Sequence, residues 1–441
     1  MTVINEIKNK QISVLGLGVT GLGIVRFLLS QNIKPIVVDS RMAPPGADWL
    51  NEHASELTTF FGDLEQADLA SNDIIIISPG LSLATPAVAN AIAAGVEVIG
   101  DVELFARLTD KPIVAVTGSN GKSTVVTLAF EVLKAAGYKV GLGGNIGTAV
   151  LDLLSQDYDV YVLELSSFQL DTTHSLKAKS ACVLNVSEDH LDRYPSYQAY
   201  IDSKQSIYNG SELAVVNAID VATHTAKQPQ VSFALANADF ALIEHQGETY
   251  FAAQGKPVLP ASCLKVVGSH NQQNALAVMA LLSPFSISTE HYQQAFSTFT
   301  GLAHRCQFVA EINEVKYFND SKATNVGATI AAIESLADQA KQLVVIAGGD
   351  AKGADLDALK PYLNGKVKAL ICFGKDAKAL VSLTEKGHLT TNMHEAVQLA
   401  KQLSSSGDIV LLAPACASID MYNNYMQRGD DFAQCVLAEA I

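Results

Sequence analysis

The sequence predicts an α/β protein with several mainly parallel sheets. Short apolar runs alternate with helical stretches along the chain, which is the pattern of strands buried between layers of helices. Two glycine-rich turns, Gly16–Gly21 and Gly118–Gly121, each join an apolar run to a helical stretch. A chain of 441 residues is also too long for a single core, so about two to four domains are expected.

The composition is that of an ordinary globular protein, with 49% hydrophobic and 17% charged residues. The net charge of −15 argues against a nucleic-acid partner, which would require a basic face. No two of the six cysteines lie within three residues of each other, so we expect reduced thiols and a cytoplasmic protein. No apolar run is long enough for membrane insertion, and glycines interrupt Ile12–Val25, which loosely resembles a signal peptide.

The first hundred residues predict a small Rossmann-like sheet. A strand at Gln11–Leu15 leads into G-x-G-x-x-G, and Asp39 follows the last glycine by eighteen positions. This motif alone suggests an NAD-dependent oxidoreductase, although such loops also occur in units that bind other nucleotides. The expected ligand lies at the carboxyl ends of the strands, near Thr20, Asp39 and Gly80. The remaining elements predicted here are a helix at 22–30, strands at 34–38, 73–77 and 95–99, a helix at 87–94 and a connecting helix at 101–110.

The stretch Pro112–Ser123 predicts a phosphate-binding loop. A strand at Ile113–Val116, a turn of small residues and a helical pattern that opens at Lys122 and runs over Val125–Ala136 together aim backbone N–H groups and a helix dipole at an anion. Lys122 can reach the outer phosphates of ATP, and the Ser123 hydroxyl can bind Mg²⁺. The spacing departs from the standard P-loop, because Val116 stands where that motif has its first glycine. The alternative is a tight strand–helix turn with an exposed lysine.

Two later strands in the same region carry polar residues at their ends. Glu164 ends the apolar run Tyr158–Leu165, where a carboxylate is a natural Mg²⁺ ligand, the alternative being a helix cap. The run Ala181–Val186 leads to His190, for which we favour a metal or substrate role over a surface position. Lys204, in a helix predicted over 196–209, is by itself an ordinary solvated lysine. The other elements predicted here are strands at 139–142, 213–216, 231–235, 240–243 and 249–251, a helix at 271–282 and a linker at 301–305.

The last third of the chain predicts another α/β domain. It opens with a hairpin, Phe308–Ile312 and Val315–Phe318, that turns at Asn313–Glu314. The polar segment Asn319–Asn325 follows and leads into a helix. The further elements are helices at 326–336 and 394–404 and strands at 342–347, 368–373 and 409–412.

Seven motifs follow one another along the chain: Thr117–Thr124, Glu164–Leu170, Asp189–Tyr194, His270–Ala275, Leu302–Arg305, Asn319–Asn325 and Leu412–Tyr425. In this order they closely resemble the motifs of the Mur ligases of peptidoglycan synthesis, and within them those of the D-glutamate-adding members. The resemblance covers essentially the whole chain. Other Mur ligases and folylpolyglutamate synthetases share the ATP motifs, whereas the SSFQL and PACAS stretches resemble the D-glutamate-adding enzymes.

The resemblance implies a fold and a reaction. The expected domains are a UDP-substrate-binding Rossmann-like domain at 1–102, a central ATP-binding domain of P-loop type at 103–301, and a C-terminal Rossmann-like α/β domain at 302–441 that binds the incoming amino acid. The implied enzyme is an ATP-dependent, ADP-forming ligase that adds D-glutamate to UDP-N-acetylmuramoyl-L-alanine through an acyl phosphate, with Mg²⁺ as cofactor. A cytoplasmic monomer is expected.

The resemblance also implies roles for individual residues. The UDP-substrate contacts would be Thr20, Gly21, Asp39, Ser40, Arg41, Gly80, Asn145 and Gln169. The ATP contacts would be Gly118, Ser119, Asn120, Gly121, Lys122, Ser123, Thr124, Asn271, Asn274, Arg305 and Asp320. The metal ligands would be Ser123, Glu164, His190 and Lys204, the last as a carbamate, and Lys122, His190 and Lys204 would be catalytic. The D-glutamate contacts would be Lys322, Thr324, Lys352, Ser418 and Tyr425.

Two positions depart from the family pattern. Tyr425 stands where we expect phenylalanine, and Ala413 stands where we expect serine. Three alternatives stay open on the sequence alone: an NAD-dependent oxidoreductase, a non-catalytic nucleotide-binding protein, and a related ligase that adds L-lysine or diaminopimelate. The oxidoreductase leaves the Lys122 loop unexplained.

Overall fold

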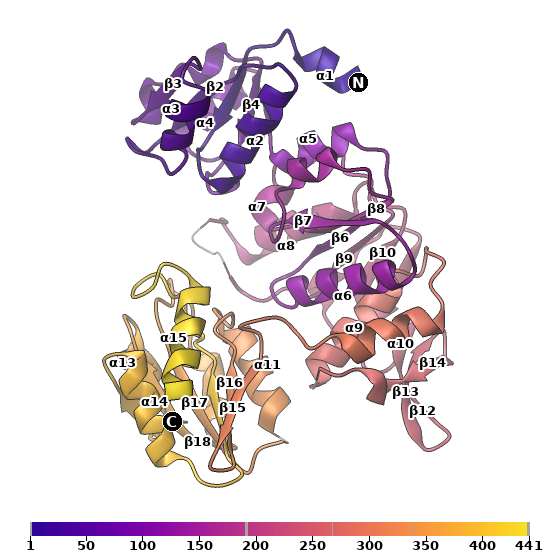
Figure 1. Cartoon of the computed structure of the whole chain (residues 1–441), viewed down its shortest axis with the longest axis vertical. Helices are drawn as coiled ribbons and strands as arrows, with labels where there is room; N and C mark the ends of the chain where they lie inside the picture. Colours follow the sequence, from indigo (N-terminus) through magenta and orange to yellow (C-terminus); the bar gives the residue numbers. More distant parts are fainter. Residues whose placement is uncertain (1, 190–192, 267, 338, 439–441) are drawn as a thin grey trace. The chain divides into compact units, whose positions relative to one another are not determined.

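The computed structural model describes residues 2–189, 193–266, 268–337 and 339–438. These residues form three sheets (Figure 1). The chain divides into two compact units. The first holds residues 1–186, 193–263 and 275–296, and the second holds 187–192, 264–274 and 297–441.

The N-terminal sheet of the first unit has five parallel strands in the order β3-β2-β1-β4-β5. Its strands are β1 (Ile12–Leu15), β2 (Ile36–Asp39), β3 (Thr59–Phe61), β4 (Ile74–Ile77) and β5 (Glu97–Ile99). Its helices are α1 (Thr2–Ile7), α2 (Val19–Ser30), α3 (Ala47–His53), α4 (Pro86–Ala93) and α5 (Asp101–Leu108). Helix α2 packs on one face of the sheet and α4 on the other, which explains why β1 and β4 are apolar throughout.

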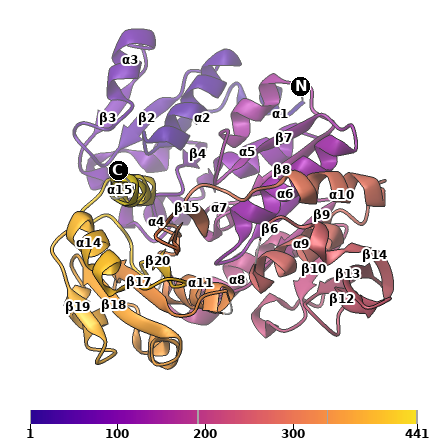
Figure 2. The same ribbon diagram turned by 60° about the horizontal axis from the view of Figure 1, so that its bottom comes forward.

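The central sheet has nine strands in the order β14-β13-β12-β11-β10-β9-β6-β8-β7. They are β6 (Ile113–Thr117), β7 (Val140–Gly144), β8 (Val160–Glu164), β9 (Ser180–Val183), β10 (Ala214–Asn217), β11 (Gln230–Phe233), β12 (Phe240–His245), β13 (Glu248–Ala253) and β14 (Lys256–Pro260). The strands from β7 to β12 are parallel to their neighbours, whereas β12, β13 and β14 form an antiparallel edge, visible in both ribbon views (Figures 1 and 2).

The helices of this region are α6 (Lys122–Ala135), α7 (Ser167–Leu170), α8 (Tyr197–Gln205), α9 (Ser269–Leu281) and α10 (Thr289–Thr298). Helix α6 begins at Lys122, where the sequence prediction has the helical pattern open. Helix α8 ends at Gln205 and continues as a 3₁₀ turn, Ser206–Tyr208. Side chains of α5 and α8 pack with β6, β8 and β9 in one apolar core that continues to α2 and β1.

The second unit contains a six-stranded sheet in the order β15-β16-β20-β17-β18-β19. Its strands are β15 (Gln307–Ile312), β16 (Val315–Asn319), β17 (Leu343–Gly348), β18 (Val367–Phe373), β19 (Gly387–Leu389) and β20 (Ile409–Leu412). Only the β15–β16 hairpin is antiparallel. Its helices are α11 (Val326–Ala337), α12 (Lys360–Leu363), α13 (Ala377–Val381), α14 (Met393–Leu403) and α15 (Tyr425–Ala438).

The helices of this sheet are divided between its two faces. Residues of α11, α12 and α13 share one apolar core with the sheet, and residues of α14 and α15 share the other. The loops that follow β16, β20 and β17 leave neighbouring parallel strands at the same edge, so they lie together. The sequence prediction missed α15, although this helix contributes Phe432 and Val436 to the core.

Candidate active site

The phosphate loop predicted at Pro112–Ser123 is present at the carboxyl end of β6. Its turn requires glycine at two positions, because Gly118 has φ +146° and Gly121 has φ +83°. A Cβ atom on Gly118 would also lie 3.1 Å from Leu184 Cβ. Gly121 is the N-cap of α6, so the loop leads directly to a helix amino terminus, the dipole end that favours an anion.

Asn185 holds this loop in place. The backbone N–H of Ser119 donates to Asn185 O at 2.9 Å, and that of Asn120 donates to Asn185 Oδ1 at 2.8 Å. The Asn185 amide donates in return to Asn120 O at 3.1 Å. Sequence reasoning missed this residue. The sequence feature that could have indicated a role for Asn185 is its position two residues after β9, the strand that pairs with β6.

The ammonium group of Lys122 lies over the same turn. Its Nζ donates to Gly118 O at 2.7 Å and to Ser119 O at 3.0 Å. The cation therefore sits where the loop and the first turn of α6 would receive a phosphate.

Glu164 and Ser123 bring two oxygen ligands together beside the loop. Glu164 ends β8 opposite Val116 of β6 and is 2% exposed. Ser123 Oγ donates to Glu164 Oε2 at 2.6 Å, and Asn145 Nδ2 donates to Glu164 Oε1 at 2.7 Å. A hydroxyl and a carboxylate at a phosphate loop suit Mg²⁺, which takes one or two protein oxygens and completes its shell with phosphates and water.

Lys204 also belongs to this cluster. The sequence alone suggested a solvated lysine, but the side chain is buried, and its Nζ lies 3.1 Å from Gly118 O and 4.5 Å from the centre of the Tyr200 ring. The Tyr200 hydroxyl lies 3.3 Å from Ser119 Oγ. Helix α8 therefore contributes two side chains to the phosphate loop.

His190, predicted as a metal ligand and catalytic residue, lies outside the described residues. Within the described ranges, no group of three or more His, Cys, Asp or Glu side chains has the arrangement of a metal site. The described part of the predicted metal site therefore consists of Ser123, Glu164 and Lys204.

The residues predicted to bind UDP lie at the carboxyl edge of the N-terminal sheet. Asp39 Oδ2 accepts from Leu17 N at 2.6 Å and from Arg41 Nη2 at 2.7 Å. Burial opposes ionisation of Asp39, but the hydrogen bonds from Arg41 and Leu17 outweigh it and hold the carboxyl pKa below its usual value. Gly21 must be glycine, because a Cβ atom there would collide with Gly16 O.

The other predicted UDP contacts surround this carboxylate. Thr20 lies in the first turn of α2, half-buried, while Ser40 is exposed directly after β2. Gly80 is exposed in the loop after β4, across the β1–β4 pair from the glycine turn. This edge is where the order of the parallel strands reverses, the usual ligand position of such sheets.

Gln169, predicted to contact the muramoyl group, is 3% exposed at the end of α7. Its Oε1 accepts from Ser166 N at 3.1 Å, and Ser166 Oγ accepts in return from Gln169 N at 3.2 Å, which fixes Gln169 against the start of α7. Burial raises the pKa of Asp101, the first residue of α5, to about 6, and the Gln169 side chain acts in the opposite direction. Sequence reasoning missed Asp101.

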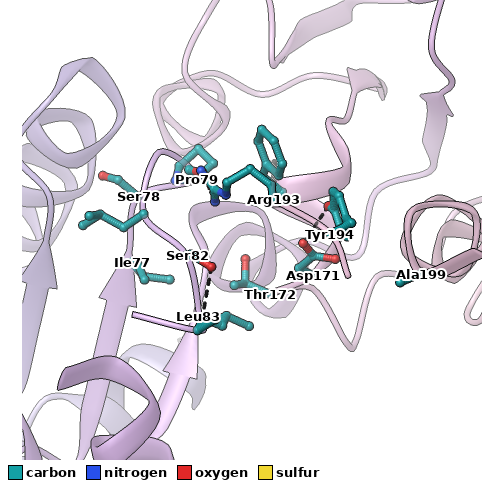
Figure 3. Close-up of a pocket in the computed structure, with 13 residues that line it drawn as sticks. Ile77, Ser78, Pro79, Ser82, Leu83, Asp171, Thr172, Arg193, Tyr194 and Ala199 are labelled. Carbon is teal, nitrogen blue, oxygen red and sulfur yellow. Dashed lines mark hydrogen bonds between the residues drawn. The ribbon is translucent and has the colours of Figure 1, made fainter. Parts of the chain in front are cut away.

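A pocket of about 370 Å³ lies between the end of β4 and α7 (Figure 3). One wall is formed by Ile77, the last residue of β4, and by residues of the following segment as far as Ala84. The other wall includes Phe168, Arg193 and Tyr194. The Arg193 guanidinium stacks 4.3 Å above the centre of the Phe168 ring and donates to Gly80 O at 3.1 Å. Arg193 thus joins the loop after β4 to α7.

The residues predicted to bind D-glutamate lie on loops of the second unit. Lys322 and Thr324 follow β16, Lys352 follows β17, and Ser418 follows β20. Tyr425 begins α15, and the Nζ atom of Lys322 lies 4.2 Å from the centre of its ring. Because β16, β20 and β17 are neighbours in the sheet, these loops form one polar edge.

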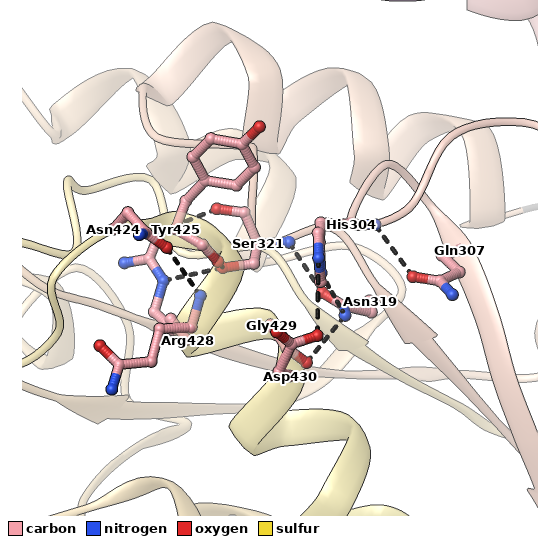
Figure 4. A network of polar contacts seen from close by, with 10 residues as sticks. His304, Gln307, Asn319, Ser321, Asn424, Tyr425, Arg428, Gly429 and Asp430 are labelled. Carbon is pink, nitrogen blue, oxygen red and sulfur yellow. Dashed lines mark hydrogen bonds and ion pairs between the residues drawn. The ribbon is translucent and has the colours of Figure 1, made fainter. Parts of the chain in front are cut away.

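The predicted ATP contacts are divided between the two units. Residues 118–124 belong to the first, whereas Asn271, Asn274, Arg305 and Asp320 belong to the second. Asn274 Nδ2 lies 3.5 Å from Asn271 Oδ1. Burial raises the pKa of Asp320 to about 6, against the opposing charge of Arg305. His304, next to Arg305, contacts Asn319 at 3.1 Å through Nδ1 (Figure 4).

Fold and site together define an α/β enzyme that uses ATP at a phosphate loop. Three family models match successive parts of the chain: "Mur ligase MurD-like, N-terminal domain" at residues 10–100, "Mur ligase middle domain" at 116–282 and "Mur ligase, glutamate ligase domain" at 304–416. The chain belongs to the Mur ligase family, whose members are ATP-dependent ligases.

Curated relatives match over nearly the whole chain. The UDP-N-acetylmuramoylalanine--D-glutamate ligase of Pseudoalteromonas translucida is 71% identical, with 100% of both chains covered. That of Escherichia coli is 46% identical over 97% of this chain and 98% of its own length. The solved structure of the UDP-N-acetylmuramate-alanine ligase of Thermotoga maritima aligns with a TM-score of 0.62 at 16% identity, covering 98% of this chain and 100% of its own, and supports the fold alone.

None of the helices in the described ranges combines the length and the apolar character that a membrane crossing requires.

Proposed function

We propose that this protein joins D-glutamate to UDP-N-acetylmuramoyl-L-alanine, with ATP converted to ADP and phosphate, in peptidoglycan precursor synthesis. The observation that carries the proposal is the cluster of Lys122, Ser123, Glu164 and Lys204 around one phosphate loop. The names of the curated relatives, one of them 71% identical over the whole chain, supply the substrates. In a coupled assay, ADP formation should require both UDP-N-acetylmuramoyl-L-alanine and D-glutamate.

The reaction needs ATP because a carboxylate is a poor acylating agent. The terminal carboxylate of the L-alanyl group attacks the γ-phosphorus of ATP, the bond to the bridging oxygen breaks, and ADP leaves. The neutral amine of D-glutamate then attacks the acyl carbon of the acyl phosphate, and inorganic phosphate leaves with one proton lost from nitrogen. The first step brings two anions together, so a cation at the γ-phosphate lowers its barrier.

The chain's own groups suit that first step. Lys122 places its ammonium over Gly118 O and Ser119 O, at the mouth of the loop. Ser123 and Glu164 would hold Mg²⁺, which when bound neutralises phosphate charge. The backbone of the turn Gly118–Gly121 and Thr124 in the first turn of α6 would surround the phosphates.

We further propose that Lys204 is carbamylated and that it acts with His190 at a second metal. The buried Nζ of Lys204 lies 3.1 Å from Gly118 O, beside the phosphate loop. A free ammonium group would repel Mg²⁺, whereas a carbamate carries negative charge and two oxygens. Formation requires a neutral amine and CO₂ and releases one proton.

The UDP portion would bind at the edge of the N-terminal sheet, on Thr20, Gly21, Asp39, Ser40, Arg41 and Gly80. The ion pair between Asp39 and Arg41 fixes a carboxylate acceptor and a guanidinium donor at this edge. Gly21 lets the start of α2 pack closely against the backbone of Gly16. Asn145 and Gln169 would contact the muramoyl group. The pocket is lined by Pro79 and Leu81, which flank Gly80, and by Phe168, which precedes Gln169, so it would receive part of the same substrate.

The incoming amino acid would bind on the loops of the second unit, at Lys322, Thr324, Lys352, Ser418 and Tyr425. Two lysines suit a dicarboxylate and disfavour a cationic side chain, which argues against the related ligases that add L-lysine or diaminopimelate. Asn271, Asn274, Arg305 and Asp320 would complete the ATP contacts. We place the domain boundaries at 1–102, 103–301 and 302–441, and expect a cytoplasmic monomer.

A further inference from the structure

Arg428 is a buried cation at the base of the polar loops of the second unit. Its side chain is 1% exposed and lies one turn after Tyr425 in α15 (Figure 4). Burial lowers the pKa of the guanidinium to about 10, so it remains charged at neutral pH. Among the described residues, no carboxylate forms an ion pair with it, although the charge of Asp420 acts on it from a greater distance.

The guanidinium binds the backbone at the carboxyl ends of three neighbouring strands, β16, β17 and β20. Nη2 donates to Ser321 O at 2.8 Å, in the loop after β16. Nη1 donates to Gly348 O at 3.2 Å, at the end of β17, and to Cys416 O at 3.1 Å, in the loop after β20. One planar group thus sets the spacing of three neighbouring loops.

Ser321 extends this arrangement to the start of α15. Arg428 Nε donates to Ser321 Oγ at 3.0 Å, and Ser321 Oγ donates to Tyr425 O at 2.8 Å. The Tyr425 ring in turn lies 4.2 Å from Lys322 Nζ. A shift of the guanidinium would therefore displace the backbone on both sides of the Lys322–Tyr425 contact.

We infer that Arg428 is a positioning residue for the incoming amino acid, holding the loops after β16, β17 and β20 at the separation that D-glutamate requires. The inference rests on the proposed function, because Lys322, Lys352 and Ser418 lie on these loops. Arg428 does not touch the amino acid itself.

The test compares Arg428→Lys with a matched control in the same sheet. Lysine keeps the charge but has a single donor centre, so it cannot reach three loops at once. The control is Lys368→Met. Lys368 pairs with Asp408 at 3.0 Å, and both residues lie at the amino ends of strands β18 and β20, at the edge of the sheet opposite to the three loops. The control variant therefore removes an ion pair of the same sheet and leaves the contacts of the three loops in place.

Hydrogen–deuterium exchange of the ligand-free protein measures the loops directly. Arg428→Lys should speed amide exchange in 320–325, 349–353 and 413–418 about tenfold, while Lys368→Met should leave these loops unchanged. This measurement does not depend on the substrate. Unchanged exchange in folded Arg428→Lys would overturn the inference even if the proposed reaction is correct.

Steady-state kinetics then separates positioning from a general loss of structure. Arg428→Lys should raise KM for D-glutamate about tenfold, with KM for ATP and for UDP-N-acetylmuramoyl-L-alanine within about twofold of the wild type. A parallel rise of all three KM values would contradict a role confined to the amino acid.

A second variant serves if Arg428→Lys does not fold. Ser321→Ala removes only the bridging hydroxyl and should raise KM for D-glutamate about threefold, and an unchanged KM would refute the inference. Wild-type protein that forms no ADP with D-glutamate would instead refute the proposed function.

Discussion

The hydroxyl of Ser123 donates a 2.6 Å hydrogen bond to Oε2 of Glu164 and so joins the first turn of α6 to the carboxyl end of β8. The other carboxylate oxygen accepts from Asn145 at 2.7 Å. Three side chains from three successive segments of the central sheet therefore meet beside the phosphate loop. The hydroxyl of Ser123 and the carboxylate of Glu164 supply the oxygen atoms of the proposed Mg²⁺ site, and the Asn145 amide nitrogen holds the carboxylate in place.

Glu164→Gln should fold normally and lose Mg²⁺ affinity. The amide keeps one acceptor oxygen for Ser123 or Asn145 but lacks the charge that binds the cation, so the Mg²⁺ concentration for half-maximal ATP turnover should rise at least about 100-fold. The measurement is a Mg²⁺ titration of activity. Asp157→Asn is the control, because Asp157 is an exposed carboxylate paired with Lys111. Equal Mg²⁺ dependence of the wild type and Glu164→Gln would exclude Glu164 as a ligand.

Lys122→Ala should abolish ATP turnover, with a loss of at least about 1,000-fold in kcat, while the thermal unfolding profile stays close to that of the wild type. The reason is that Lys122 is the cation that lies over the turn Gly118–Gly121. Lys134→Ala, in the last turn of the same helix, serves as the control and should remain active. Near-normal turnover of folded Lys122→Ala would mean that this turn does not bind the reacting phosphates.

The phosphate loop was predictable because its chemistry is local. A strand, a turn with two glycines and a helix start with Lys122 and Ser123 are consecutive in sequence. The position of Lys204 was not predictable from spacing, because its burial depends on α8 packing across β6 and β9. The same holds for Asn185, which binds Asn120 from 65 residues away, and for Arg428, which binds Gly348 and Ser321 from 80 and 107 residues away, because such distant contacts leave no local pattern.

Lys204→Ala should lose activity, and a short-chain carboxylic acid at high concentration should restore part of it. The buried Nζ lies beside Gly118 O, so a carbamate on it would lie next to the proposed metal, and the added carboxylate would replace the carbamate oxygens. The measurement is ADP formation with increasing concentrations of acetate or propionate, with a short-chain amine as the control. Rescue by the amine but not by carboxylates would show that the residue acts as an unmodified ammonium group.

Asp101→Asn should change how stability depends on pH. Burial raises the pKa of Asp101 in the folded protein to about 6, above its usual 3.8. The folded state therefore holds a proton that the unfolded state loses between pH 3.8 and 6, so the wild type should lose stability relative to Asp101→Asn as pH rises through this window. The difference should reach about 3 kcal/mol at most.

Urea unfolding of both proteins between pH 4 and 7 measures this difference. At pH 4 Asp101 is protonated in the folded protein, so the pH-dependent part of the difference in unfolding free energy between the two proteins should be smallest. Above pH 6 this difference should reach its full value in favour of the asparagine variant. Two parallel stability profiles across this range would contradict a raised pKa of Asp101 in the folded protein.

The central claim is that this chain forms an amide bond between UDP-N-acetylmuramoyl-L-alanine and D-glutamate at the expense of ATP. The most direct measurement is ADP formation with that acceptor across a panel of D-glutamate, L-glutamate, L-lysine and meso-diaminopimelate, with product mass determined in parallel. The account predicts ADP formation and an equimolar D-glutamyl product with D-glutamate alone, and no turnover when either substrate is omitted. ADP formation with L-lysine or diaminopimelate but not with D-glutamate, or ADP formation that ignores the amino acid, would contradict it.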